Sequence, residues 1–153
     1  MRNKKARKGK AARKQQTKRK ASKKQVARGL FPPRLAVLTK IIIKKNGQID
    51  IPGKLISFQK GVLVWLIHNK STDPHTMSID PASFKINGVP ENPLQEDVLL
   101  PVVVSPGGFD VIVGRLKPAA RIAAYHYEIN ALDMVRNTRV TIDPDLDVVD
   151  PRP

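Results

Sequence analysis

Short apolar runs separated by turn-forming residues constrain the fold of this chain more than any other feature. The clearest runs, residues 35–43 and 61–68, are rich in Val, Ile and Leu and have the length of strands. Asn46-Gly47 and the segment 105–108 are typical of the turns between such runs. Further strands are expected at residues 75–80, 98–104, 109–113, 123–130 and 137–143. Seven or eight short strands at this spacing predict an all-β fold, an antiparallel Greek-key β-sandwich.

The charge of the chain is divided unevenly along its length. Residues 1–28 hold 14 of the 28 Lys and Arg residues and no acid, whereas the other 14 share residues 29–153 with all 13 acids, a net charge of 14 − 13 = +1. Like charges at short spacing, without an apolar stripe to bury, predict that residues 1–28 form a disordered basic arm. We therefore expect three parts: the arm at 1–28, the sandwich at 29–143 and a solvated, acidic, Pro-containing extension at 144–153.

The basic arm has the chemistry of a non-specific polyanion binder. Each cation that reaches a phosphate releases counterions, which gives an affinity that falls steeply with salt. The arm has no aromatic residue to stack on bases, so nothing in it reads sequence. A solubilising or targeting role and attachment to an anionic membrane surface are the alternatives, and the second is disfavoured because no Trp, Phe or Leu face is visible for insertion. The candidate binding residues are Lys4, Lys5, Arg7, Lys8, Lys10, Arg13, Lys14, Lys18, Arg19, Lys20, Lys23 and Lys24.

Several functional classes lack their residues in this sequence. There is no cysteine, hence no disulfide, thiolate metal site or cysteine nucleophile. No apolar run approaches the roughly 20 residues needed to span a membrane, and no signal peptide is visible, so the chain as written is expected to be cytoplasmic. If the true start codon lies further upstream, a signal peptide would precede this sequence and the protein would be extracytoplasmic. No nucleophile elbow, phosphate-binding loop or dinucleotide motif occurs, which predicts that the chain is not an enzyme and uses no cofactor.

Two segments of the sandwich resemble the cupredoxin family. The first is Val64-Trp65-Leu66-Ile67-His68-Asn69, followed by a polar loop and Pro74-His75-Thr76-Met77. The second is Tyr125-His126-Tyr127-Glu128-Ile129, preceded by Lys117-Pro118 and followed by Val140-Thr141-Ile142. The resemblance covers residues 35–143 and implies a small β-sandwich with a copper site at one end.

The ligands that the resemblance implies are mostly missing. His75 matches the first copper ligand, whereas Ile129 and Leu132 stand where the resemblance places the cysteine and the second histidine; Met134 falls near the axial position. Because Ile and Leu cannot coordinate a metal, type 1 copper is not expected. His75 remains a weak metal candidate, and a partly buried, hydrogen-bonded histidine at a loop–strand junction is the favoured interpretation.

Other side chains are expected to serve the fold rather than a site. Strand alternation predicts that His126 and Glu128 point away from the face shared by Tyr125, Tyr127 and Ile129. Trp65, inside a continuous apolar strand, is expected to anchor the core.

The sequence therefore favours a non-enzymatic binding protein: a cupredoxin-like sandwich without copper, whose basic arm binds nucleic acid or another polyanion. Two alternatives remain open. One is a structural coat-type protein whose arm neutralises RNA, and the other is an exported, metal-handling cupredoxin relative. The sequence leaves open the oligomeric state, the identity of the polyanion and any ligand of the sandwich.

Overall fold

The computed structural model describes residues 36–51 and 53–150, which form thirteen strands and one short 3₁₀ helix, η2 (Pro81–Ser83). No helix in this part of the chain has the length and apolarity to cross a membrane. The strands are β1 (Ala36–Ile43), β2 (Ile49–Asp50), β3 (Leu55–Phe58), β4 (Val62–Asn69), β5 (His75–Ile79), β6 (Lys85–Ile86), β7 (Val89–Pro90), β8 (Val102–Val104), β9 (Phe109–Arg115), β10 (Ala123–His126), β11 (Ile129–Asp133), β12 (Thr138–Ile142) and β13 (Asp145–Val149).

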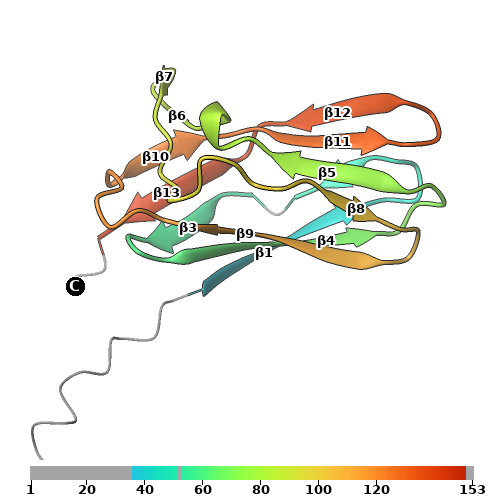
Figure 1. Cartoon of the computed structure of the whole chain (residues 1–153), viewed down its shortest axis with the longest axis horizontal. Helices are drawn as coiled ribbons and strands as arrows, with labels where there is room; N and C mark the ends of the chain where they lie inside the picture. The colour runs from blue at the N-terminus through green and yellow to red at the C-terminus, as the bar shows by residue number, and fades with distance from the viewer. Residues whose placement is uncertain (1–35, 52, 151–153) are drawn as a thin grey trace, which may run out of the picture. The chain divides into compact units, whose positions relative to one another are not determined.

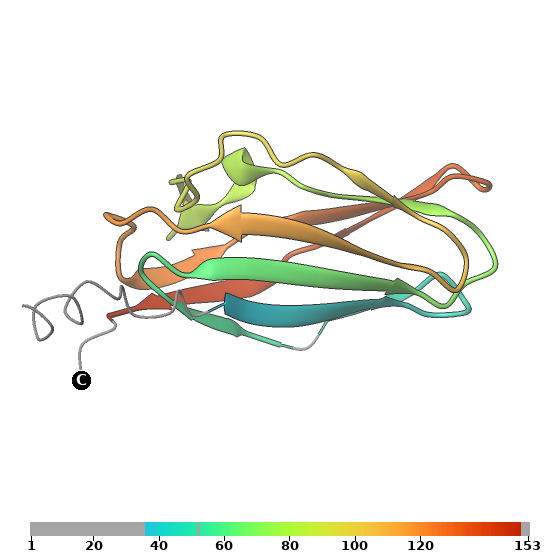
Figure 2. The same cartoon turned by 60° about the horizontal axis from the view of Figure 1, so that its bottom comes forward.

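One layer of the sandwich is the sheet with strand order β2-β1-β4-β9. Strands β1 and β4 pair in parallel over their full eight residues, and β9 pairs antiparallel with β4 (Figure 1). In β4 the core-facing side chains alternate with outward-facing ones, as expected for a strand at the centre of a sheet that packs on one face. Figure 2 shows β1, β4 and β9 side by side in blue, green and orange.

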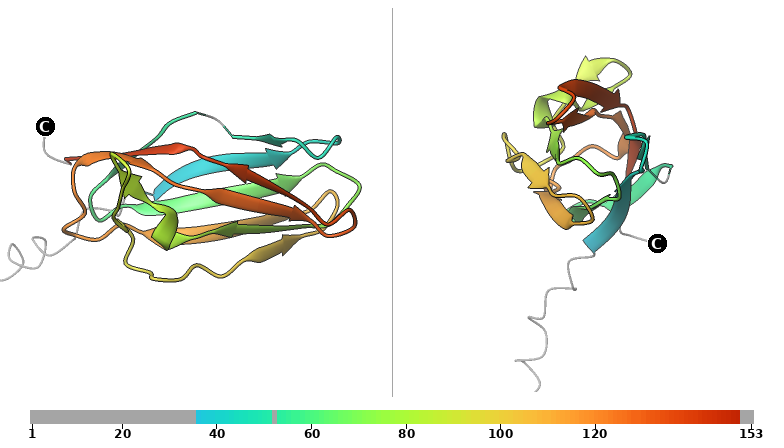
Figure 3. Two further views of the ribbon diagram at one scale, coloured as in Figure 1. Left: turned by 90° about the horizontal axis from the view of Figure 1, so that it is seen from above. Right: turned by 90° about the vertical axis from the view of Figure 1, so that its right-hand side faces the viewer.

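The opposite layer consists of two sheets that share long, interrupted strands. Their strand orders are β12-β11-β5-β8 and β3-β13-β10-β6-β7. Only Tyr127 and Glu128 separate β10 from β11, and Asp143 and Pro144 separate β12 from β13. The backbone N–H of Tyr127 donates to the Pro144 carbonyl (3.2 Å), which links the two sheets where both strands are interrupted. These sheets enclose the core together with β2-β1-β4-β9 (Figure 3).

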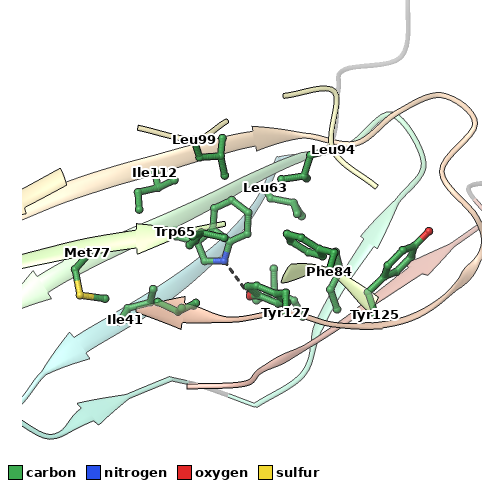
Figure 4. Packing of buried hydrophobic residues seen from close by; sticks show 14 of the residues in the cluster. Ile41, Leu63, Trp65, Met77, Phe84, Leu94, Leu99, Ile112, Tyr125 and Tyr127 are labelled. Atoms are coloured by element: carbon green, nitrogen blue, oxygen red, sulfur yellow. Dashed lines mark hydrogen bonds between the residues drawn. The ribbon is translucent and has the colours of Figure 1, made fainter. Parts of the chain in front are cut away.

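Aromatic side chains from both layers meet at the centre of the core. The indole N–H of Trp65 donates to the hydroxyl oxygen of Tyr127 (3.0 Å), and the Tyr127 ring stacks on Phe84 at 4.7 Å (Figure 4). Gly114 on β9 leaves room for the indole, because a β-carbon there would lie 3.2 Å from Trp65. The predictions that Trp65 is a core anchor and that Tyr125, Tyr127 and Ile129 face inward are confirmed.

The all-β sandwich predicted from the sequence is confirmed, with two refinements of strand pairing. The pairs β1–β4 and β3–β13 are parallel, whereas the other pairs are antiparallel. The predicted strand at 123–130 is interrupted at Tyr127 and Glu128, and the one at 98–104 is reduced to Val102–Val104, because Pro101 lacks the N–H that a ladder needs.

The prediction of a solvated acidic extension after residue 143 is wrong for β13. Leu146 is fully buried and Val148 nearly so, and β13 pairs with β10 on one side and β3 on the other. Asp145 and Asp147 alternate with these apolar residues and point outward. There Asp145 binds His126 (2.6 Å) and Asp147 binds Lys54 (2.6 Å). Outward-facing and buried residues alternate from 145 to 149, as in a strand. The acids and prolines around this segment made the alternation hard to recognise in the sequence.

Candidate functional site

A solvent-open cavity of about 480 Å³ lies at the end of the sandwich where the β1–β2 turn, the start of β5 and the β11–β12 turn meet. Its lining mixes charged, polar and apolar side chains: Lys44, Asn46, Gly47, Gln48, Ile49, His75, Ala131, Asp133, Arg136, Thr138 and Val140.

His75 is the first residue of β5 and is held by the loop that precedes it. Its side chain is only 3% exposed, and its Nδ1 lies 2.9 Å from the backbone oxygen of Asp73 and 3.3 Å from Ser71 Oγ. Asn69 fixes the loop, since its amide donates to the carbonyls of Asp73 (2.8 Å) and Val104 (2.9 Å). The expectation of a hydrogen-bonded histidine at a loop–strand junction is confirmed, and its burial is more complete than expected.

Asp133 is the residue that faces His75 across the β5–β11 pair. Its Oδ1 accepts the backbone N–H groups of Val135 and Arg136 (2.9 Å each), which closes the β11–β12 turn. The Arg136 amide hydrogen bond contributes most to holding the Asp133 pKa below its usual value, and His75 and the Arg136 charge act in the same direction. The Arg136 side chain also bridges the two loops, with Nε 3.4 Å from Asp73 Oδ2 and 3.8 Å from Asp133 Oδ2.

This arrangement fastens the loops rather than offering a set of metal ligands. His75 Nε2 and Asp133 Oδ2 are 3.9 Å apart, too far for a hydrogen bond, and the guanidinium of Arg136 lies beside the carboxylate. Over residues 36–51 and 53–150, no group of three His, Cys, Asp or Glu side chains could hold a metal ion.

The residues that the resemblance aligns with copper ligands do not gather around His75. Ile129 pairs with Ile79 inside the core, four residues along the strand, and Met134 is half exposed in the turn. The β5–β11 register therefore places Asp133, and not Ile129, opposite His75. With no thiolate in the sequence and a carboxylate hydrogen-bonded to its own turn, the residues present do not fit a type 1 copper site.

The remaining histidines lie outside the cavity. His126 is exposed and bound to Asp145, and Glu128 is half-buried, so both point away from the core-facing tyrosines as predicted. His68 lies on the outer face of β4, where its ring stacks on Phe109 at 4.0 Å. Burial lowers the His68 pKa, and the nearby Lys70 and Lys40 lower it further, so the neutral ring is favoured at neutral pH.

The candidate polyanion-binding residues of the arm lie outside the described residues. Conversely, sequence reasoning missed Lys44 and Arg136 at the cavity. The contact of Arg136 with Asp73 joins loops that are distant in sequence, and only the pairing of β5 with β11 brings the two residues together.

No protein-family model matches the sequence, and no curated protein matches it. The structure is similar to parts of solved multicopper oxidases. For the multicopper oxidase from Campylobacter jejuni, a metallo-oxidase, the identity is 15% and the TM-score 0.42, over 80% of this chain and 31% of that one. For the blue copper oxidase from Nitrosomonas europaea the values are 10% and 0.39, over 78% and 47%. For Lac15 from a marine microbial metagenome they are 12% and 0.36, over 78% and 33%.

The fold is an all-β sandwich, and the solved structures that it resembles are multicopper oxidases. This chain spans only about a third to a half of the length of these oxidases, and at such scores the similarity carries no argument about ligands or activity. The prediction that the chain is not an enzyme is withdrawn: it rested on missing motifs alone, and the solved structures that the chain resembles in fold are oxidases. A non-enzymatic role is therefore not carried into the function proposed below.

Proposed function

We propose that this chain is a polyanion-binding protein, in which residues 1–28 engage nucleic acid or another polyanion non-specifically and a cupredoxin-like sandwich without a type 1 copper site carries them. The observation that carries the proposal is the separation of charge along the chain. Residues 1–28 hold 14 cations and no acid, whereas the described sandwich has 12 Lys and Arg against 13 Asp and Glu.

Ion pairs within the sandwich support an external role for the arm's charge. Most of the acids of the sandwich already have a cationic partner or a histidine there, so they do not need the arm for neutralisation. The paired acids are Asp50, Asp73, Glu91, Glu96, Asp133, Asp145 and Asp147. Such surface pairs add little stability, but each cancels local charge.

The expected binding is electrostatic and blind to sequence. If about half of the 14 cations contact phosphates at once, the log–log slope of affinity against salt on duplex DNA is roughly −6, at about 0.9 per phosphate. The arm has no aromatic side chain, so unrelated sequences should bind equally well.

Replacing Lys4, Lys5, Lys8 and Lys10 by Gln tests the proposal. We expect weaker binding to every nucleic acid tried and a slope reduced to roughly −4, since about half of the replaced charges would have been engaged. Fluorescence anisotropy with two unrelated DNA duplexes and one RNA, at salt concentrations from about 50 to 300 mM, measures both quantities.

The matched control removes the same charge from the sandwich. Lys45, Lys60, Lys85 and Arg139 form no ion pair with another described residue, and Gln at these four positions should leave the slope unchanged. Equal losses in both variants, or a loss for one sequence only, would contradict the proposal. A nucleoprotein particle of megadalton mass in light scattering would instead favour the coat-type alternative.

A further inference from the structure

The outer face of the sheet β2-β1-β4-β9 is apolar although nothing else in the described chain packs on it. Strand alternation turns every second side chain of β1, β4 and β9 outward, and the pairing registers place them in four rows. We call these positions the outer apolar face. The rows are Ala36–Val62–Arg115, Leu38–Val64–Val113, Lys40–Leu66–Val111 and Ile42–His68–Phe109.

The exposure on this face is contiguous rather than scattered. Leu38 is 62% exposed and Phe109 59%, and Val111 and Val113 lie between 40% and 50%. Val64 and Leu66 fill the centre between them, half-buried by their neighbours. A sheet with a solvated face normally alternates apolar with polar residues, and single exposed apolar residues need no explanation. A continuous apolar field over three strands indicates a surface that contacts something.

The charges on the outer apolar face are cationic and lie at its borders. Lys40 is on β1 and Arg115 at the far end of β9, while Lys70 follows β4 near His68 and, with Lys40, acts on its pKa. The nearby acids are held by cations, since Glu96 lies 3.6 Å from Arg115 and Asp50, opposite Ile42, lies 3.4 Å from Lys44. The face is thus apolar in the middle and positive at its margin.

We infer that this face rests on an anionic membrane surface, and that the lipid headgroups are the polyanion bound by the arm. The inference depends on the proposed function, because it needs the arm to bind polyanions. Alone, either feature gives marginal membrane binding, whereas an apolar contact combined with a polybasic segment supplies the two signals that stable attachment requires. Residue 28, the last of the arm, precedes the first strand of the face by only eight residues.

Physical features of the sheet suit this contact. The central strand β4 pairs with β1 on one side and β9 on the other, so its backbone groups already have partners when the face approaches the headgroup region. The stems of Lys40 and Arg115 can lie along the apolar surface while their charged ends reach phosphates. The His68 ring stacks on Phe109, and because its neutral form is favoured it places no charge within the outer apolar face.

A second copy of the chain fits this face less well than a membrane. Three strands about 4.8 Å apart and about 25 Å long present on the order of 350 Å², which is well below the roughly 800 Å² that each partner contributes to a stable interface. The cationic margin would meet itself in a symmetric pair, and each copy carries a formal charge of +15. Nucleic acid fits poorly too, because aliphatic side chains offer neither charge nor stacking.

Flotation with lipid vesicles tests the inference on the full chain. We expect binding to vesicles of phosphatidylcholine with phosphatidylglycerol and little binding to phosphatidylcholine alone. Replacing Leu38, Val111 and Val113 by Thr keeps strand propensity and should lower vesicle affinity about tenfold or more, while DNA binding stays as in the parent. The matched control replaces Ile56, Val89 and Val140 by Thr, three exposed residues on other sheets, and should bind vesicles as the parent does.

The outcomes separate this inference from the proposed function. Equal vesicle binding by the Leu38/Val111/Val113 variant and the parent would overturn the membrane contact but leave polyanion binding intact. If the full chain bound neither vesicles nor DNA, the proposed function itself would be wrong. Binding to DNA without binding to anionic vesicles would assign the arm to nucleic acid, and a dimer in light scattering without lipid would assign the face to a second copy.

A site-specific probe gives a second measurement. Because the chain has no cysteine, Val113→Cys and Val140→Cys each introduce a single thiol for an environment-sensitive dye. The dye at position 113 should shift to shorter wavelength on addition of anionic vesicles, and the dye at 140 should not. Equal shifts at both positions would overturn the assigned orientation.

Discussion

Trp65 contributes to the core both as a large apolar side chain and as a hydrogen-bond donor. Its indole N–H reaches Tyr127 from the opposite layer, and its ring meets that of Tyr127 edge-on at 6.0 Å. Burial raises the pKa of Tyr127 to about 12, with a further contribution from Asp145, while the Trp65 hydrogen bond opposes the shift. One polar contact thus links the two layers inside an otherwise apolar core.

Tyr127→Phe should destabilise the fold by about 1–3 kcal/mol, because it leaves the buried indole N–H without an acceptor. Urea unfolding followed by the fluorescence of Trp65, the only tryptophan in the chain, measures the change. Tyr125→Phe is the control, since the Tyr125 hydroxyl donates to the Arg121 carbonyl (3.2 Å) at a wetter site and should cost less.

Alkaline unfolding separates the hydroxyl's role from packing. A tyrosine whose folded pKa is raised keeps its proton between about pH 10 and 12 while the unfolded chain releases it, so stability falls as pH rises through that range. Tyr127→Phe should lose stability less steeply there. An identical alkaline limb would show that the phenol is not held neutral by the fold.

Single residues differed in how well the sequence revealed them. Trp65 and His75 stood in patterns with local meaning, an apolar strand and a loop–strand junction, and both predictions were confirmed. Asp133 and Arg136 carry no local pattern, because their contacts with His75 and Asp73 exist only once β5 and β11 pair. The strand register that places Asp133 opposite His75 cannot be derived from the sequence alone.

At the scale of elements, β13 shows how composition can hide a strand. Three aspartates and flanking prolines made residues 144–153 look like a solvated tail, yet Leu146 packs between Tyr125 of β10 and Leu55 of β3. The alternation from 145 to 149 was visible, but predicting the parallel partner β3 required knowing that a chain segment ninety residues earlier lay beside it. The apolar runs, by contrast, predicted β1, β4 and β9 within one or two residues.

Leu146→Ala should destabilise the chain by about 2–5 kcal/mol, the range for a fully buried leucine that leaves a cavity. Thermal or urea unfolding measures it. Ile56→Ala on the neighbouring β3, at a position 56% exposed, is the control and should change stability by no more than about 0.5 kcal/mol.

A loss below about 1 kcal/mol for Leu146→Ala would mean that β13 unfolds separately from the rest of the sandwich. The expected large loss would place it in the same cooperative unit as β10, its antiparallel neighbour.

At the scale of the whole molecule, sequence reasoning separated the basic arm from a nearly neutral body, but it did not predict the outer apolar face. Membrane attachment was disfavoured because no inserting face was visible in the arm. The face consists of alternate residues from three strands that are separate in the sequence, and the apolar runs alone do not show that one side of these strands is exposed. Only the sheet order shows that one side of β1, β4 and β9 is left uncovered.

Neutralising the arm should leave the stability of the sandwich unchanged. With Lys4, Lys5, Lys8 and Lys10 replaced by Gln, we expect the same Tm within about 1 °C, because most of the acids of the sandwich have a cationic or histidine partner within the sandwich. Scanning calorimetry at low salt measures it. Lys54→Gln is the contrasting variant: it removes the 2.6 Å contact with Asp147, which raises the Lys54 pKa, and should lower Tm slightly.

A fall of several degrees in the arm variant would show that the arm neutralises the sandwich instead of remaining available to a partner. That result would contradict the assumption that the arm is available to bind a polyanion, on which the proposed function depends.

The position of β13 also affects when the molecule can fold during synthesis. It is the last strand of the described chain, yet it lies inside its sheet, between β3 and β10, and covers part of the core with Leu146 and Val148. A nascent chain that has emerged only as far as β12 therefore has β3 without a partner in that sheet and an incomplete core. The sandwich can close only after residue 149 has left the ribosome, so until then the apolar residues that β13 covers stay exposed to other contacts.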